Sequence, residues 1–110
     1  MNEGIVVLIT AGSDEEAARI AQALVDEHLA ACVNIIPAVQ SVFFWESKTQ
    51  TAREALLVCK SRAPLLQKII DRVKALHSYS VPEIIALPIF GGSSDYLAWL
   101  RESTGTSSSN

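Results

Sequence analysis

The sequence is poor in the features that mark nucleic-acid-binding, secreted and membrane proteins. Its nine Lys and Arg residues are scattered among twelve Asp and Glu, so no basic stripe is available for nucleic acid or an anionic membrane. No apolar run approaches the roughly 18 residues that a membrane helix needs. No basic region precedes the first apolar run, and we therefore expect no signal peptide and a cytoplasmic protein without membrane insertion.

Cysteine and glycine are also scarce. The two cysteines, Cys32 and Cys59, lie in apolar runs without Cys-x-x-Cys spacing, which predicts buried free thiols in a reducing compartment. Gly12 and the pair Gly91-Gly92 stand outside any phosphate-binding glycine pattern. No Ser, Thr or Cys has the sequence context of a nucleophile, so we expect no catalytic residues and no enzyme activity.

What the chain does contain is enough apolar material for one core. Of its 110 residues 49% are hydrophobic and 19% are charged, which is sufficient for a single domain without a stabilising metal. We place that domain at residues 1–103. The remaining residues, 104–110, are rich in Ser and are expected to form a disordered tail.

The first half of the chain predicts a strand, a helix and a long interrupted strand. Ile5 to Thr10 is a continuous β-branched run, and Ser13 with Glu16 forms a capping box that begins a helix over Asp14 to Leu29. A second strand runs from Cys32 to Trp45. Pro37 interrupts it and should lie at a bulge or on a sheet edge, because proline cannot donate a ladder hydrogen bond.

The second half repeats this order. After a polar connection over residues 46–51, Glu54 to Lys60 reads as a strand, and Pro64 to Leu76 as a helix with a one-sided apolar stripe. A last strand covers Val81 to Phe90, and Asp95 to Arg101 forms a closing helix. The order β-α-β-β-α-β predicts an α+β ferredoxin-like two-layer sandwich with a C-terminal helix, an antiparallel sheet and both longer helices on one face.

The segment Val39 to Trp45 is apolar on both faces, although helices cover only one face of such a sheet. Five bulky apolar residues in seven suggest that the second face meets another protein surface, and we favour a homo-oligomer. The alternative is that Phe43 or Phe44 lies under a loop of the same chain.

Two clusters carry candidate functional residues. His77, Tyr79 and Glu83 fall between a helix and a strand, and such groups bind metals or move protons. Trp45 and Glu46 form a second cluster at the end of the long strand. The structural alternatives are a helix-capping His, a packing Tyr and a solvated Glu in the first cluster, and a strand-end aromatic with an exposed charged turn in the second.

Several segments together resemble one known family. They are residues 29–37 (LAACVNIIP), Trp45-Glu46, Ser78-Tyr79, residues 81–89 (VPEIIALPI) and the closing helix around Tyr96 to Leu100. Over about residues 4–102, in one register, they are similar to the CutA (divalent-cation tolerance) family.

The resemblance implies a homotrimer of ferredoxin-like subunits around a threefold axis, similar to the PII signalling proteins. It also implies a role in the response to divalent metal ions, with ligand sensing or signalling in clefts between subunits. The cleft residues that it suggests are Trp45, Glu46, Lys60, His77, Tyr79 and Glu83.

The sequence departs from the family where some bacterial members bind copper. Their ligands, a Cys in the first strand and a double His before the Tyr, correspond here to Ile9, Leu76 and His77, and the family's His-Pro-Tyr-Glu segment reads His-Ser-Tyr-Ser over residues 77–80. One imidazole cannot make a tight site. We therefore expect no required cofactor and at most weak binding of Cu(II) or another divalent cation, with His77 and Cys32 as candidate ligands.

Two alternative functions remain open at this stage. The chain could be a structural or scaffolding trimer that binds a protein partner. It could also be a small acylphosphatase-like hydrolase, since residues 10–13 (TAGS) place a helix N-terminus where an anion could bind, although the Arg that this chemistry needs is missing.

Overall fold

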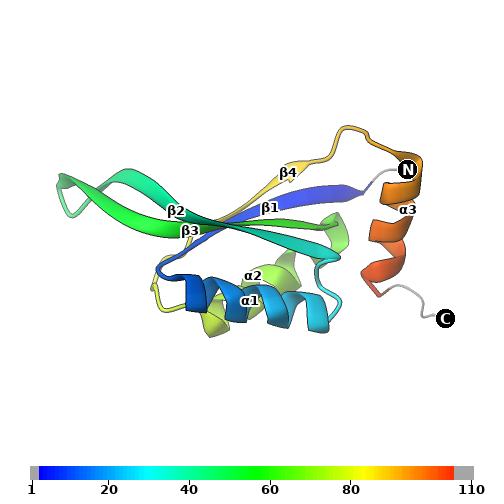
Figure 1. Ribbon diagram of the computed structural model, residues 1–110, viewed down its shortest axis with the longest axis horizontal. Helices are drawn as coiled ribbons and strands as arrows, with labels where there is room; N and C mark the ends of the chain where they lie inside the picture. Colours follow the sequence, from blue (N-terminus) through cyan, green and yellow to red (C-terminus); the bar gives the residue numbers. More distant parts are fainter. Residues whose placement is uncertain (1–2, 106–110) are drawn as a thin grey trace.

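The computed structural model describes residues 3–105 and contains one four-stranded antiparallel sheet and three α-helices (Figure 1). The elements are β1 (Gly4–Ala11), α1 (Asp14–Asp26), β2 (Cys32–Trp45), β3 (Lys48–Arg62), the 3₁₀ turn η1 (Ala63–Leu65), α2 (Leu66–Leu76), β4 (Ile84–Pro88) and α3 (Ser94–Ser103). The strand order is β2-β3-β1-β4. This confirms the predicted α+β ferredoxin-like arrangement.

Helices α1 and α2 lie side by side under one face of the sheet (Figure 1), and the core fills the space between the two layers. Alternate side chains of a strand point to opposite faces, so every second side chain of β1 and of β3 faces the helices. The fully buried side chains of this core are Val7, Ile9, Ala11, Ala17, Ile20, Leu24, Ala55, Leu57, Cys59, Ile69 and Val73.

The capping box at the start of α1 forms only in part. Ser13 Oγ accepts a hydrogen bond from Glu16 N at 3.1 Å, as predicted. The Glu16 carboxylate does not return to the cap residue; it accepts from Gly12 N at 3.0 Å and from Ser78 N at 2.6 Å. Glu16 therefore joins the start of α1 to the segment that follows α2.

Strand β2 continues through Pro37 by means of a β-bulge, as predicted for that residue. Ile36 pairs with Leu56, and Val39 pairs with Glu54, so β2 has one residue more than β3 in this interval. Ala38 has a φ of 59°, a left-handed conformation typical of an irregularity of this kind. Because of this extra residue, the strand continues past Pro37 although proline has no amide hydrogen to donate.

Three predicted segments have different bounds in the structure. The polar connection is only a two-residue turn, because Glu46 and Ser47 both adopt positive φ and allow β3 to begin at Lys48. Helix α1 ends at Asp26, since His28 is left-handed. Strand β4 starts three residues later than expected and ends at Pro88.

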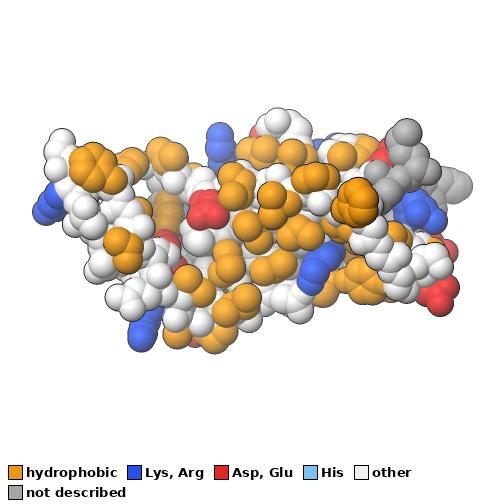
Figure 2. Space-filling model, turned by 90° about the horizontal axis from the view of Figure 1, so that it is seen from above, with side chains coloured by type: hydrophobic (Ala, Val, Ile, Leu, Met, Phe, Trp, Pro, Cys, Tyr) orange, Lys and Arg blue, Asp and Glu red, His pale blue; other side chains and the backbone are white. Residues whose placement is uncertain are grey.

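The sheet face opposite the helices carries an apolar surface that no helix covers within residues 3–105 (Figure 2). We call this surface the bare face; its larger members are Val6, Leu8, Ile36, Phe43, Trp45, Leu56, Val58, Ile85 and Leu87. Ile85 and Leu87 are 52% and 51% exposed. The alternative that a loop covers Phe43 or Phe44 is wrong for residues 3–105, in which these side chains are 39% and 73% exposed.

A buried cation fixes the end of α3 to the sheet. Arg62 Nε donates to Thr104 Oγ1 at 2.7 Å, and another guanidinium nitrogen donates to Thr104 O at 3.3 Å. Thr104, which the sequence analysis assigned to the tail, is thus buried. Residues 106–110 of the predicted tail lie outside the described part of the chain.

Replacing Thr104 by Val should lower the free energy of unfolding by about 2 kcal/mol, because it leaves a buried charged donor without its acceptor. The control is Ser103→Ala, since the Ser103 hydroxyl makes no hydrogen bond among residues 3–105. Urea denaturation at one protein concentration measures both variants. Equal stability of the Thr104→Val variant and the wild type would contradict this assignment.

Candidate functional site

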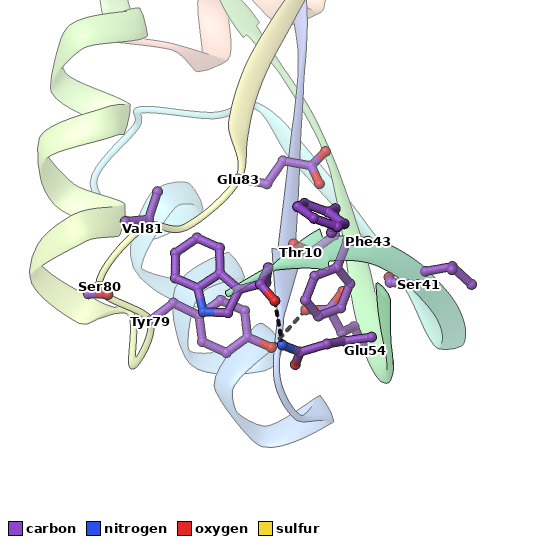
Figure 3. A pocket seen from close by; sticks show the side chains of 12 residues that line it. Thr10, Ser41, Phe43, Glu54, Tyr79, Ser80, Val81 and Glu83 are labelled. Atoms are coloured by element: carbon purple, nitrogen blue, oxygen red, sulfur yellow. Dashed lines mark hydrogen bonds between the residues drawn. The ribbon is translucent and has the colours of Figure 1, made fainter. Parts of the chain in front are cut away.

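A cavity of about 860 Å³ opens at one end of the bare face, between the β2–β3 hairpin and the segment that leads into β4 (Figure 3). It is lined by Thr10, Ser41, Val42, Phe43, Phe44, Trp45, Gln50, Glu54, Tyr79, Ser80, Val81 and Glu83. All four strands or their immediate flanks contribute to it. We call it the hairpin cavity.

Tyr79 forms one wall of the hairpin cavity and is held at both ends. Its hydroxyl donates to Glu54 Oε2 at 2.7 Å. Burial, and then the hydrogen bond and charge of Glu54, raise the pKa of Tyr79 to about 12, so the phenol stays protonated near neutral pH. Gly12 lies against this ring, because a Cβ there would come within 3.2 Å of the Tyr79 hydroxyl.

His77 lies behind the cavity and orients Tyr79. Its Nε2 bonds to Thr10 O at 2.7 Å, which requires Nε2–H, and its Nδ1 accepts from Tyr79 N at 3.0 Å. The two rings also pack, with centroids 4.7 Å apart. Both ring nitrogens are therefore used for backbone groups, and the His77 side chain is fully buried.

Glu16 anchors the same segment from the helix side. It is 4% exposed, and one carboxylate oxygen lies 3.7 Å from His77 Nδ1. Burial raises the pKa of Glu16, but the hydrogen bonds from Ser78 and Gly12 outweigh this, and the net effect lowers it below 4.5. The ionised carboxylate thus fixes the start of the loop that carries Tyr79.

The structure does not bring the two candidate metal ligands together. His77 bonds to Thr10, which pairs with Leu56, whereas Cys32 pairs with Lys60. Four residues along one strand separate these points by about 13 Å. Residues 3–105 contain no group of three or more His, Cys, Asp or Glu side chains that could hold a metal ion.

The predicted cleft residues divide into two groups. Trp45, Tyr79 and Glu83 line the hairpin cavity, and His77 supports it from behind. Lys60 lies six residues from Glu54 along β3, about 20 Å away, where its amine contacts Asn34.

Glu46 also lies outside the cavity lining, at the exposed turn of the β2–β3 hairpin. This position matches the structural alternative for Glu46.

Both cysteines are free thiols. Cys59 is buried in the core, and burial raises its pKa to about 12, which makes it unreactive. Cys32 is partly exposed on the bare face beside Tyr96; burial, and then this thiol, raise the pKa of Tyr96.

Sequence reasoning missed Glu54 and Gln50 as cavity residues. The alternation of β3 could have placed both on one face with Lys48. Which β2 residues pair with Glu54 and Gln50, however, depends on the position of the turn at Glu46 and of the bulge near Pro37. The hydrophobic pattern of the sequence fixes neither the turn nor the bulge position.

Replacing Glu16 by Gln should lower the free energy of unfolding by about 2 kcal/mol at neutral pH, because two backbone donors, in partly buried hydrogen bonds, lose their charged acceptor. Since folding lowers the pKa of Glu16, this contribution is complete above pH 4.5 and is lost as the pH falls through the lower folded value. Denaturation from pH 7 to pH 3 should show the variant and wild-type curves converging.

The matched control for this experiment is Glu15→Gln, one residue earlier on the exposed side of α1. It should change stability by less than about 0.5 kcal/mol. A wild-type advantage over Glu16→Gln that stays constant down to pH 3 would show that the carboxylate charge does not hold the loop.

Comparison with known proteins agrees with the fold. Residues 5–103 match the family model described as "CutA1 divalent ion tolerance protein". The CutA1 structure from Oryza sativa superposes with a TM-score of 0.93 at 49% identity, covering 96% of this chain and 97% of that one. The divalent cation tolerance protein from Thermus thermophilus gives 0.91 at 52%, covering 93% and 99%.

Curated relatives give the same result. The Thermus thermophilus divalent-cation tolerance protein CutA is 53% identical over 100 residues, 91% of this chain and 97% of that protein. The chloroplastic CutA 1 of Oryza sativa is 51% identical over 100 residues, 91% of this chain but 56% of that protein, so the chain spans little more than half of the plant relative.

Location differs among these relatives: a structural neighbour from Archaeoglobus fulgidus is described as periplasmic. Within residues 3–105 of the present chain, no helix is both long and apolar enough to cross a membrane. The family model covers almost the whole described chain, and two relatives exceed 50% identity. The chain therefore belongs to the CutA1 divalent ion tolerance protein family.

Proposed function

We propose that this chain acts as a homotrimer in the tolerance of divalent cations, and that it does so by sensing a ligand in clefts between subunits. The observation that carries the proposal is the bare face together with the hairpin cavity at its end. A second layer of protein over the bare face would remove its apolar residues from water. Identical copies are the simplest source of that layer, in keeping with the trimer that the family resemblance implies.

Tight metal binding is a weaker explanation of cation tolerance for this chain. Both ring nitrogens of His77 hold backbone groups. The β3 partner of Cys32, Lys60, lies four residues, or about 13 Å along the strand, from Leu56, the partner of the Thr10 that His77 contacts. A metal at His77 would have to displace Thr10 O or Tyr79 N. We therefore propose that any copper binding is weak and that no cofactor is needed.

The structure of the turn after β1 argues against the hydrolase alternative. In an acylphosphatase-like enzyme the turn after β1 would present free amides to a phosphate. Here the Glu16 carboxylate already accepts from Gly12 N, and Ser13 Oγ accepts from Glu16 N. A carboxylate in this position repels an anionic substrate, so we propose a protein without catalytic activity.

The location we propose is the cytoplasm. Free thiols at Cys32 and Cys59 suit a reducing compartment. Cys32 is partly exposed, so it would be open to oxidation elsewhere unless another copy covered it.

Sedimentation equilibrium tests the oligomer. We expect the wild type at three times the 11.9 kDa chain mass. Leu87→Lys should lower this mass, because it places a charge among the apolar residues of the bare face, on the edge strand β4. The matched control Val25→Lys, on the exposed side of α1, should leave the mass unchanged. A wild type at the mass of a single chain would contradict the proposal.

Growth in copper sulfate tests the cellular role. In a bacterial strain that lacks its own CutA gene, we expect the wild type and Val25→Lys to restore growth and Leu87→Lys to fail. Calorimetry with copper sulfate should give only weak binding. If Leu87→Lys restores growth as well as the wild type, the cellular role does not depend on the oligomer. If calorimetry shows tight copper binding, the protein confers tolerance by sequestering copper directly, which would contradict the proposal.

A further inference from the structure

We propose that the hairpin cavity binds organic cations, that is, an amine, ammonium or guanidinium group joined to an apolar body. This inference rests on the proposed function in one respect: neighbouring copies would close the open side of the cavity. Its chemistry follows from the residues that this chain itself contributes.

The charge of the hairpin cavity is negative. Its twelve lining residues include two carboxylates, Glu54 and Glu83, and no Lys, Arg or His. Glu83 makes no hydrogen bond or ion pair within residues 3–105, and its side chain is exposed toward the cavity (Figure 3). A phosphate, nucleotide or carboxylate ligand would meet two like charges and no compensating cation.

The walls of the cavity are aromatic. Phe43, Phe44, Trp45 and Tyr79 all line it, and each is more than a third exposed in the single chain, so each has ring surface that the chain itself does not cover. A cation over such a face is attracted by the negative π surface of the ring. The hydrogen bond from the Tyr79 hydroxyl to Glu54 sets an aromatic ring beside a carboxylate, which is a favourable pair for an ammonium group.

The size and wall chemistry favour an organic ion over a bare metal. About 860 Å³ lies within the range of small-molecule sites and far exceeds the space of one coordinated ion. Divalent cations select several oxygen ligands at fixed distances, and residues 3–105 hold no group of three or more His, Cys, Asp or Glu side chains placed to supply them. An organic cation can place an apolar body against Phe43 and Val81 and its charge near Glu54 or Glu83.

Three probes with one ring and different charges test this inference: benzylamine, benzyl alcohol and benzoate at pH 7. Trp45 fluorescence reports binding at the cavity, in a Trp99→Phe background that removes the other tryptophan. We expect benzylamine, as its ammonium ion, to bind at least about tenfold more tightly than benzoate, with benzyl alcohol between them.

Charge-removing variants locate the effect. Glu83→Gln should weaken benzylamine binding about threefold to tenfold and leave benzyl alcohol unchanged. The matched control Glu102→Gln, exposed on α3 and outside the cavity lining, should change neither.

Three results would overturn the inference: benzoate binding as tightly as benzylamine, no fluorescence change with benzylamine up to about 10 mM, or equal benzylamine affinity in Glu83→Gln and the wild type. The mass of each variant is measured in parallel. A trimer without preference for the cation refutes this inference alone, whereas a monomer refutes the proposed oligomer.

Discussion

The sheet of this protein has two apolar faces, and the chain supplies helices for only one of them. Helices α1 and α2 bury Val7, Ile9 and their partners, while Ile85 and Leu87 on the opposite face stay half exposed. A monomer could relieve this exposure only with polar substitutions or an added layer, and residues 3–105 contain neither. The exposed apolar area is therefore the constraint that joins the fold to the proposed assembly, and the hairpin cavity lies at its end.

The cavity depends on a polar network below it. The Glu16 carboxylate holds the amides of Gly12 and Ser78, and His77 connects Thr10 O to Tyr79 N. These bonds tie the loop before β4 to the end of β1 and the start of α1. Of the residues that first suggested a metal or proton-transfer site, His77 positions the Tyr79 wall of the cavity, and Glu83 joins Glu54 as a carboxylate in its lining.

Much of the fold could be predicted from the sequence, because alternation and helical spacing report burial directly. The first strand, both long helices and the bulge at Pro37 follow from such patterns. The two-residue turn at Glu46 could not, since neither Glu46 nor Ser47 is a residue that favours positive φ. The site was predicted only in part. Trp45, Tyr79 and Glu83 all line the cavity, whereas Lys60 lies six residues beyond Glu54 along β3 and Glu46 lies at the exposed hairpin turn.

The central claim is that the bare face is covered in solution. Hydroxyl-radical footprinting of the native protein tests this claim most directly. In the isolated chain Ile85 and Leu87 are 52% and 51% exposed, and Val25 on α1 is 38% exposed. After correction for the intrinsic reactivity of each residue type, an uncovered sheet would show faster oxidation of Ile85 and Leu87 than of Val25. We predict the reverse, with both bare-face residues protected and Val25 reactive. Oxidation of all three in proportion to their exposure in the single chain would contradict the account.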